Sequence, residues 1–240
     1  MKTIFLFIAL IAVTHLRGQE VVNIVLVGPN GITEDIKQAE SFIVVKQFPT
    51  YFERIDYKKG GPRIRSRCYK DSSLSVLEGS FVQYRQDGGI LATGNYKDNK
   101  KNDHWRTYDD TGKLVSFLKY ENDLPVETID ITKKDSVKTY GDEKESDFPG
   151  GEKAWRKYIL KSLERNEAAK SSTGGVVIVD FRIGENGEVL GASIQKSVEF
   201  GLDEAALEMI RKSPKWIPAW QNGHTVKSYK RQAITFGASE

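Results

Sequence analysis

The stretch "GVVIVDFRIGENGEVLGASIQKS", residues 175–197, decides the fold of the second half of the chain. In its first part apolar side chains recur with a period of two, as they do on one face of a β-strand. "ENGE" then supplies a turn, and a second apolar run returns from 189 to 194. Asp180 and Arg182 point the other way, where we expect pairing across an exposed face. The stretch predicts a hairpin whose core-directed face begins with Val177, Val179, Phe181 and Ile183.

A helix is predicted directly after this hairpin. In "LDEAALEMIRKSP", residues 202–214, apolar side chains recur at helical spacing, so one stripe can lie on the apolar face of the hairpin. The first turn is acidic and the last turn is basic, which suits the helix dipole. Pro214 then ends the helix. The apolar stripe consists of Leu202, Ala205, Ala206, Met209 and Ile210.

A second helix is predicted before the hairpin. "FPGGEKAWRKYILKSLERN", residues 148–166, gives a Pro/Gly turn followed by Trp155, Ile159 and Leu163 at helical spacing. After the other helix, "SPKWIPAWQNGHTV" (213–226) forms a corner, and a last strand runs to Phe236. The predicted order is helix, strand, strand, helix, strand. Residues 148–240 are therefore expected to form an α+β domain with an antiparallel sheet.

Several of these motifs occur together in one order, and they resemble the carboxyl-terminal domain of the TonB energy-transducer family. They are "FPGG", the 175–197 hairpin, "LDEAALEMI", "PKWIPAWQNGHTV" and a final "AITF", and the resemblance spans residues 148–237. One departure is that the family's usual Tyr-Pro before the first strand is absent, with "LERN" in its neighbourhood. The resemblance implies a module that binds the TonB box, an extended peptide segment of an outer-membrane transporter.

The candidate binding surface is the last strand of this domain. We expect the corner to wedge Trp216 against the helix and sheet, which fixes where that strand begins. A terminal strand left unpaired offers backbone N–H and C=O groups to an extended peptide, so strand addition is the expected recognition mode. Trp155, Phe181 and Leu202 are expected in the core. The predicted partner-binding residues are Thr225, Val226, Lys227, Ser228, Tyr229 and Lys230.

The first half of the chain contains an internal repeat. "FVQYRQDGGILATGNYKDN" (81–99) aligns with "WRTYDDTGKLVSFLKYEND" (105–123) at an offset of 24 residues, and the matches fall on aromatic residues and glycines. Each unit reads as a strand, a tight Asp/Gly turn and a second strand, with aromatic side chains packing onto the next hairpin. We expect a mainly β domain of antiparallel hairpins over 19–130, followed by a linker at 131–147.

The repeat resembles the MORN-repeat variant family over residues 69–125, through its Y-x-x-x-G-x-L core and later Y-x-(N/D) turn. That resemblance implies successive hairpins in an elongated sheet that serves as a scaffold or contact surface. An ordinary antiparallel sheet with accidental similarity is the alternative.

The amino terminus is typical of a secretory signal peptide. Lys2 precedes the apolar run "TIFLFIALIAV", which is too short to span a bilayer that needs roughly 20 residues. We expect residues 1–18 to be a signal peptide, with cleavage near Gly18–Gln19 and export to the periplasm. An uncleaved inner-membrane anchor is the competing interpretation. No cysteine comes directly after the run, which argues against a lipid-anchored amino terminus.

Composition argues against several functional classes. The 36 Lys and Arg residues are interleaved with 33 Asp and Glu residues, so we expect no nucleic-acid partner. The single cysteine, Cys68, excludes an internal disulfide and cannot by itself form a zinc site. No catalytic triad, phosphate-binding loop or metal-ligand spacing is present, so the expectation is a non-enzyme without cofactor or metal.

Two functional hypotheses remain. The first is a periplasmic TonB-like protein that binds transporter peptides by strand addition and is linked to energy-dependent transmembrane transport. The second is an envelope assembly or scaffold protein that uses both modules for protein–protein contacts without energy coupling. The expected partner is an outer-membrane transporter or another envelope protein, and a homodimer through edge strands is a further expectation.

Overall fold

The computed structural model describes residues 20–132, 143–166, 169 and 173–238. The predicted signal peptide lies outside these residues, as does most of the predicted linker. The chain divides into two compact units. The first contains residues 63–84, 91–130 and the described residues up to 59, and the second contains 60–62, 85–90 and the residues from 131 onward. None of the helices in the described part of the chain is both long and apolar enough to cross a membrane.

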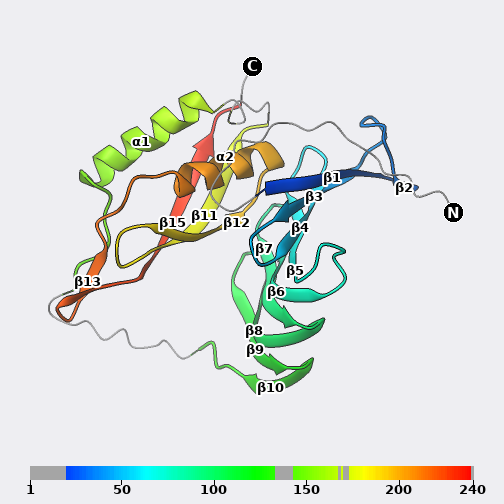
Figure 1. Cartoon of the computed structure of the whole chain (residues 1–240), viewed down its shortest axis with the longest axis horizontal. Coiled ribbons are helices and arrows are strands. Elements are labelled where there is room, and N and C mark those ends of the chain that lie inside the picture. The colour runs from blue at the N-terminus through cyan, green and yellow to red at the C-terminus, as the bar shows by residue number, and fades with distance from the viewer. Residues whose placement is uncertain (1–19, 133–142, 167–168, 170–172, 239–240) are drawn as a thin grey trace. The chain divides into compact units, whose positions relative to one another are not determined.

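The first unit is built on a ten-stranded antiparallel sheet in the order β10-β9-β8-β7-β6-β5-β4-β3-β1-β2 (Figure 1). Most strands pair with their neighbours in sequence, as expected for successive hairpins. The predicted mainly β architecture is therefore confirmed. The strands are β1 (Glu20–Gly28), β2 (Gly31–Ile32), β3 (Ser41–Gln47), β4 (Phe52–Lys58), β5 (Arg63–Tyr69), β6 (Leu77–Tyr84), β7 (Ile90–Lys97), β8 (Lys100–Tyr108), β9 (Leu114–Glu121) and β10 (Leu124–Thr128).

The 24-residue repeat of the sequence is also a repeat of hydrogen bonds. The Asn99 N–H donates to the Leu77 carbonyl at 3.0 Å, and the Leu77 N–H donates to Asn99 Oδ1 at 2.7 Å. The same pair of bonds joins Asp123 and Lys101, at 3.0 and 2.7 Å. Each bond pair fastens a two-residue turn to the strand that precedes its hairpin, and both turn residues have positive φ, as type I′ hairpins require. These turns are Asp98–Asn99 and Asn122–Asp123.

Aromatic side chains connect one repeat to the next. The Trp105 ring lies 5.3 Å from Phe81 and 5.1 Å from Tyr96, measured between ring centroids, and 6.1 Å from Tyr120. Trp105 packs directly on the backbone of Gly94, where an added Cβ would lie 2.2 Å from the indole. The repeat therefore stabilises the sheet through edge-to-face and tilted contacts between aromatic rings on one face.

The second unit contains a three-stranded sheet in the order β12-β11-β15 (Figure 1). The predicted order of helix, strand, strand, helix, strand is confirmed, with one short hairpin inserted before the last strand. The elements are α1 (Gly151–Arg165), β11 (Gly175–Ile183), β12 (Val189–Lys196), α2 (Phe200–Arg211), the inserted hairpin of β13 (Ala219–Gln221) and β14 (His224–Val226), and β15 (Ser228–Phe236).

One face of this sheet forms the core of the second unit. The four apolar β11 residues predicted to point inward are all 2% exposed or less. Leu202 and Ile210 of α2 are fully buried, and α2 contacts both β11 and β12. At the start of α2, buried Asp203 accepts hydrogen bonds from the Ser197 hydroxyl at 2.6 Å and the Val198 N–H at 3.1 Å. Asp203 therefore fixes the chain entering the helix, a more specific role than the predicted dipole effect.

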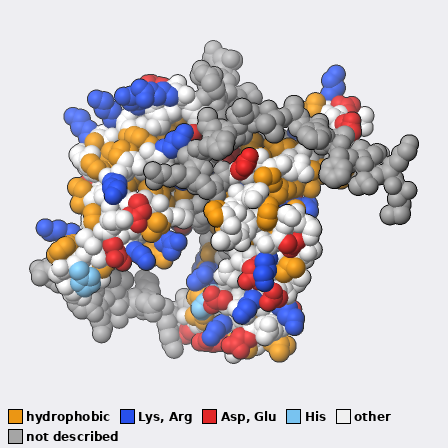
Figure 2. Space-filling view, viewed as in Figure 1, with side chains coloured by type: hydrophobic (Ala, Val, Ile, Leu, Met, Phe, Trp, Pro, Cys, Tyr) orange, Lys and Arg blue, Asp and Glu red, His pale blue; other side chains and the backbone are white. Residues whose placement is uncertain are grey.

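Charged side chains are distributed unevenly over the surface. Figure 2 shows acidic and basic side chains intermixed over β8 to β10, whereas basic side chains predominate over α1. The intermixed pattern agrees with the interleaved charges of the sequence.

Candidate functional site

The candidate site is the outer edge of β15. This strand pairs along its whole length with β11, from Ser228 opposite Ile183 to Phe236 opposite Gly175. It is the terminal strand of its sheet, and no backbone hydrogen bond joins its outer edge to another described residue. An open edge of this kind can accept an added strand.

The predicted binding residues divide between two elements. Ser228, Tyr229 and Lys230 lie at the start of β15, as expected. Thr225 and Val226 instead belong to β14, where they pair with Trp220 and Ala219, and Lys227 lies between the two strands. The expected single strand from 225 to 236 is therefore broken after Val226. The "QNG" turn closes a hairpin of its own, and the chain must leave that hairpin before it joins the sheet.

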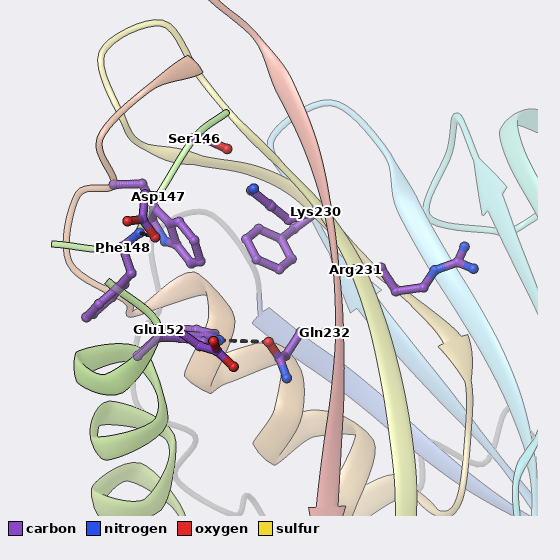
Figure 3. A pocket seen from close by; sticks show the side chains of 10 residues that line it. Ser146, Asp147, Phe148, Glu152, Lys230, Arg231 and Gln232 are labelled. Carbon is purple, nitrogen blue, oxygen red and sulfur yellow. Dashed lines mark hydrogen bonds between the residues drawn. The ribbon is translucent and has the colours of Figure 1, made fainter. Parts of the chain in front are cut away.

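Side chains along β15 alternate between two surfaces. In Figure 3, Lys230 and Gln232 point to the side of the sheet on which α1 lies, whereas Arg231 points to the opposite side. There Arg231 forms a two-point ion pair with Asp180, its cross-strand partner, with both N···O distances at 2.7 Å. The predicted pairing of Asp180 across the exposed face is thus present. Tyr229 on the same surface is 78% exposed.

A small pocket opens beside this edge. Its volume is about 160 Å³, and aromatic rings form a large part of its wall. The β15 residues contribute polar and basic groups, the segment before α1 contributes Asp147, and the first turn of α1 contributes Glu152. The lining residues are Ser146, Asp147, Phe148, Glu152, Trp155, Phe181, Trp216, Lys230, Arg231 and Gln232.

Trp216 is the centre of the aromatic wall. Its ring lies 4.9 Å from Trp155, 5.4 Å from Phe148 and 5.5 Å from Phe181, and its side chain is 8% exposed. The predicted wedge is therefore observed. The Trp216 N–H donates to the Gly187 carbonyl at 2.8 Å, which ties the corner to the β11–β12 turn.

Helix α1 is fixed to β15 and α2 by polar bonds at its aromatic residues. Trp155 Nε1 donates to Gln232 Oε1 at 2.7 Å, the contact drawn in Figure 3. The Tyr158 hydroxyl donates to the Met209 carbonyl at 2.9 Å, and burial raises the pKa of this phenol. The pocket wall contributed by α1 is thus positioned by directional bonds as well as by ring packing.

The segment before α1 was missed as part of the site. Residues 131–147 were predicted to be a solvated linker, but Ser146 is 3% exposed and its hydroxyl bonds to that of Ser228 at 2.7 Å. Lys144 and Asp147 form bridges with Trp220 and Ile217. A polar, charged segment gives no hydrophobic periodicity from which such pairing could be predicted.

Among the described residues, no group of three or more His, Cys, Asp or Glu side chains is arranged to hold a metal ion. Burial, with a smaller effect of Glu53, raises the pKa of the Cys68 thiol to about 11, so Cys68 is protonated at neutral pH and a poor nucleophile. The edge, in contrast, presents backbone donors and acceptors next to an aromatic pocket.

Part of the second unit, including the Trp216 corner and the open terminal strand, matches a known protein family. Residues 166–237 match the family model of the Gram-negative bacterial TonB protein C-terminal. This TonB match covers β11 to β15 and confirms the resemblance for this segment, whereas α1 and the "FPGG" turn lie before the matched residues. No curated protein sequence and no solved structure matches the chain.

The TonB match supports an envelope protein related to transport energy coupling. It also agrees with the expectation of a non-enzyme, because this family consists of protein-interaction domains. The match does not extend to the hairpin repeats, so their MORN resemblance stays a prediction.

Proposed function

We propose that the second unit captures an extended peptide by strand addition at the outer edge of β15. The peptide is a TonB-box segment of an outer-membrane transporter, and its capture is linked to energy-dependent transmembrane transport. The observation that carries this proposal is the terminal position of β15 in its sheet, directly beside the aromatic pocket.

Backbone pairing and side-chain recognition have separate roles in this mechanism. An added strand gains main-chain hydrogen bonds from β15, while its alternate side chains reach pockets on one surface. The pocket of about 160 Å³ is close in size to a cavity of about 150 Å³ that holds one benzene ring. We therefore expect the bound segment to place one bulky apolar side chain in this pocket, against the Phe148 and Trp216 rings.

Ser228, Tyr229 and Lys230 are the partner-binding residues of β15 in this proposal. The residues that directly precede β15 are Thr225, Val226 and Lys227. The Lys230 ammonium lies 3.6 Å from a Glu145 carboxylate oxygen, and the Glu145 side chain is 87% exposed, so this ion pair is weak and easily exchanged for a partner's carboxylate.

In this proposal the cellular compartment of the protein is inferred from the predicted signal peptide. Cleavage after residue 18 places the protein in the periplasm, where the residues from 19 to 130 form the repeat domain and those from 148 form the TonB-like domain. Inner-membrane anchoring through an uncleaved terminus is the alternative arrangement, and the mature amino terminus distinguishes the two.

A scaffold role is the second candidate, and the ten-stranded repeat sheet favours it. In this alternative both units contact envelope proteins or a second copy of the chain, with no transporter involved. Binding by the second unit would then be independent of TonB-box sequence.

Peptide N-methylation separates strand addition from other modes of binding. Full-length mature protein is titrated with TonB-box peptides that carry N-methyl groups at alternate residues, in two sets offset by one position. One set blocks the N–H groups that face β15, and the other blocks those that face solvent. Loss of two hydrogen bonds of about 1 kcal/mol each should weaken binding by about tenfold or more in one set only. Equal affinity of both sets would exclude strand addition, and no binding of any such peptide would favour the scaffold role.

A further inference from the structure

Three arginine side chains surround one carboxylate on a single face of the first sheet. Arg54 of β4 lies directly opposite Arg67 of β5, and Asp56 lies directly opposite Arg65. Residues directly opposite in an antiparallel pair share a face. Asp56 Oδ1 accepts from Arg54 Nε at 2.8 Å, and Asp56 Oδ2 accepts from Arg67 Nη2 at 2.8 Å and from Arg65 Nη2 at 3.4 Å.

The charges in this arginine cluster do not balance. Three guanidinium groups share one carboxylate, and like charges placed directly opposite across a strand pair are destabilising. Asp56 is 8% exposed and the Arg67 side chain is 17% exposed, so water screens the excess positive charge only in part. The nearest acidic neighbour in sequence, Glu53, accepts instead from the Ser66 hydroxyl at 2.6 Å.

Part of the donor capacity of the cluster is unused. The Nε atoms of Arg65 and Arg67 are buried and have no hydrogen-bond partner within the described part of the chain. The Arg54 and Arg65 side chains are 31% and 41% exposed, so a ligand can approach their outer N–H groups from solvent. Three guanidinium groups provide fifteen N–H donors by their chemistry, and Asp56 accepts from one donor of each.

An aromatic surface adjoins the cluster on the next strands. Phe81 of β6 lies opposite Arg67, and its ring centroid is 5.7 Å from that of Tyr96. Burial, with a smaller effect of Asp123, raises the pKa of Tyr96, and the charges of Arg65 and Arg67 oppose that rise. The site therefore combines excess positive charge with the neighbouring aromatic rings of Phe81 and Tyr96.

We propose that Arg54, Arg65 and Arg67 bind a phosphate group. The planar guanidinium fork matches the oxygens of carboxylates and phosphates alike. A phosphate monoester carries about −1.5 to −2 charges at neutral pH, which balances three arginines and one aspartate better than a single carboxylate does. The phosphate is carried either by a soluble ester or by a lipid headgroup, and the two sources share this recognition chemistry.

The test uses the full-length mature protein and inorganic phosphate at constant ionic strength. Phosphate binding is measured by calorimetric titration for the wild type and for Arg65→Gln, a half-exposed position whose replacement leaves the strand pairing intact. Loss of one charge-assisted hydrogen-bonding group should weaken saturable binding by about tenfold. Arg54→Gln should weaken it similarly.

The matched control is Arg106→Gln, which removes the same formal charge from β8. Arg106 follows Trp105 in the strand, so it faces the other side of the sheet, where its guanidinium lies 4.1 Å from the Phe117 ring. Arg106→Gln should bind phosphate as the wild type does. Equal binding by Arg65→Gln and the wild type, or an equal loss in Arg106→Gln, would overturn the proposal.

The source of the phosphate is distinguished with vesicles. Phosphatidylcholine vesicles with and without an anionic phospholipid are sedimented with wild type and Arg65→Gln. Arg65-dependent binding to the anionic vesicles supports a lipid headgroup, whereas phosphate binding in solution without vesicle binding supports a soluble ester. Absence of saturable binding to inorganic phosphate and to both vesicle types would refute the site.

Discussion

Gly187→Ala tests the contact that holds Trp216 in place. Gly187 has φ +83°, and an added Cβ would lie 2.1 Å from the Trp216 carbonyl oxygen. A left-handed backbone costs a non-glycine residue about 1–2 kcal/mol. Displacement of the Trp216 backbone also breaks its hydrogen bond to Gly187, at a cost of about 1 kcal/mol. We expect Gly187→Ala to lower the free energy of unfolding of the second unit by about 2–3 kcal/mol.

Gly223→Ala is the matched control. Gly223 also has φ +83°, but nothing lies within 4 Å of its added Cβ, so this variant bears the backbone strain alone. The two variants are compared by urea unfolding and by hydrogen exchange of peptides from residues 213–221. Gly187→Ala should be less stable than Gly223→Ala by about 1 kcal/mol or more, with faster exchange around Trp216. Equal stabilities of the two variants would refute the proposed anchoring of the corner.

Two further predictions concern titratable groups of the first unit. The pKa of Cys68 is raised from 9.0 to about 11 in the folded state, so its thiol ionises first in the unfolded chain as pH rises above 9.0. The wild type should therefore lose stability relative to Cys68→Ala between these two values in pH-dependent urea unfolding; a constant difference would contradict the burial argument. The pKa of Asp109 is lowered below 3.8, first by the Thr111 hydroxyl and then by the Lys113 N–H, so its stabilisation is present above pH 3.8 and is lost as pH falls through the lowered value. Asp109→Asn should reduce the thermal unfolding midpoint at neutral pH, and the difference from wild type should shrink at about pH 3; a difference that persists in acid would show that the carboxylate charge is not responsible.

Much of the fold could be predicted because its signals are local. The period of two in β11 and the helical spacing in α2 each describe one buried face, so both elements and their inward residues follow from sequence. The 24-residue repeat was predictable for a related reason, since Asp and Asn tolerate the positive φ of the turns and the aromatic residues recur with them.

The features that were not predicted from the sequence depend on contacts between segments that lie far apart in the chain. Ser146 has no local signal, and its burial becomes apparent only when Ser228 is placed beside it. The break at Lys227 was missed because the alternation of residues 225–230 continues through it, although the "QNG" turn gave grounds for a separate hairpin. The pocket likewise required Phe148, Trp155 and Trp216 to converge from three segments.

The most direct test of strand addition is amide hydrogen exchange in β15. Full-length mature protein is measured by NMR with and without a saturating TonB-box peptide. The account predicts slower exchange at alternate amides between Ser228 and Phe236, those not already bonded to β11. A bound peptide that leaves β15 exchange unchanged would contradict the account.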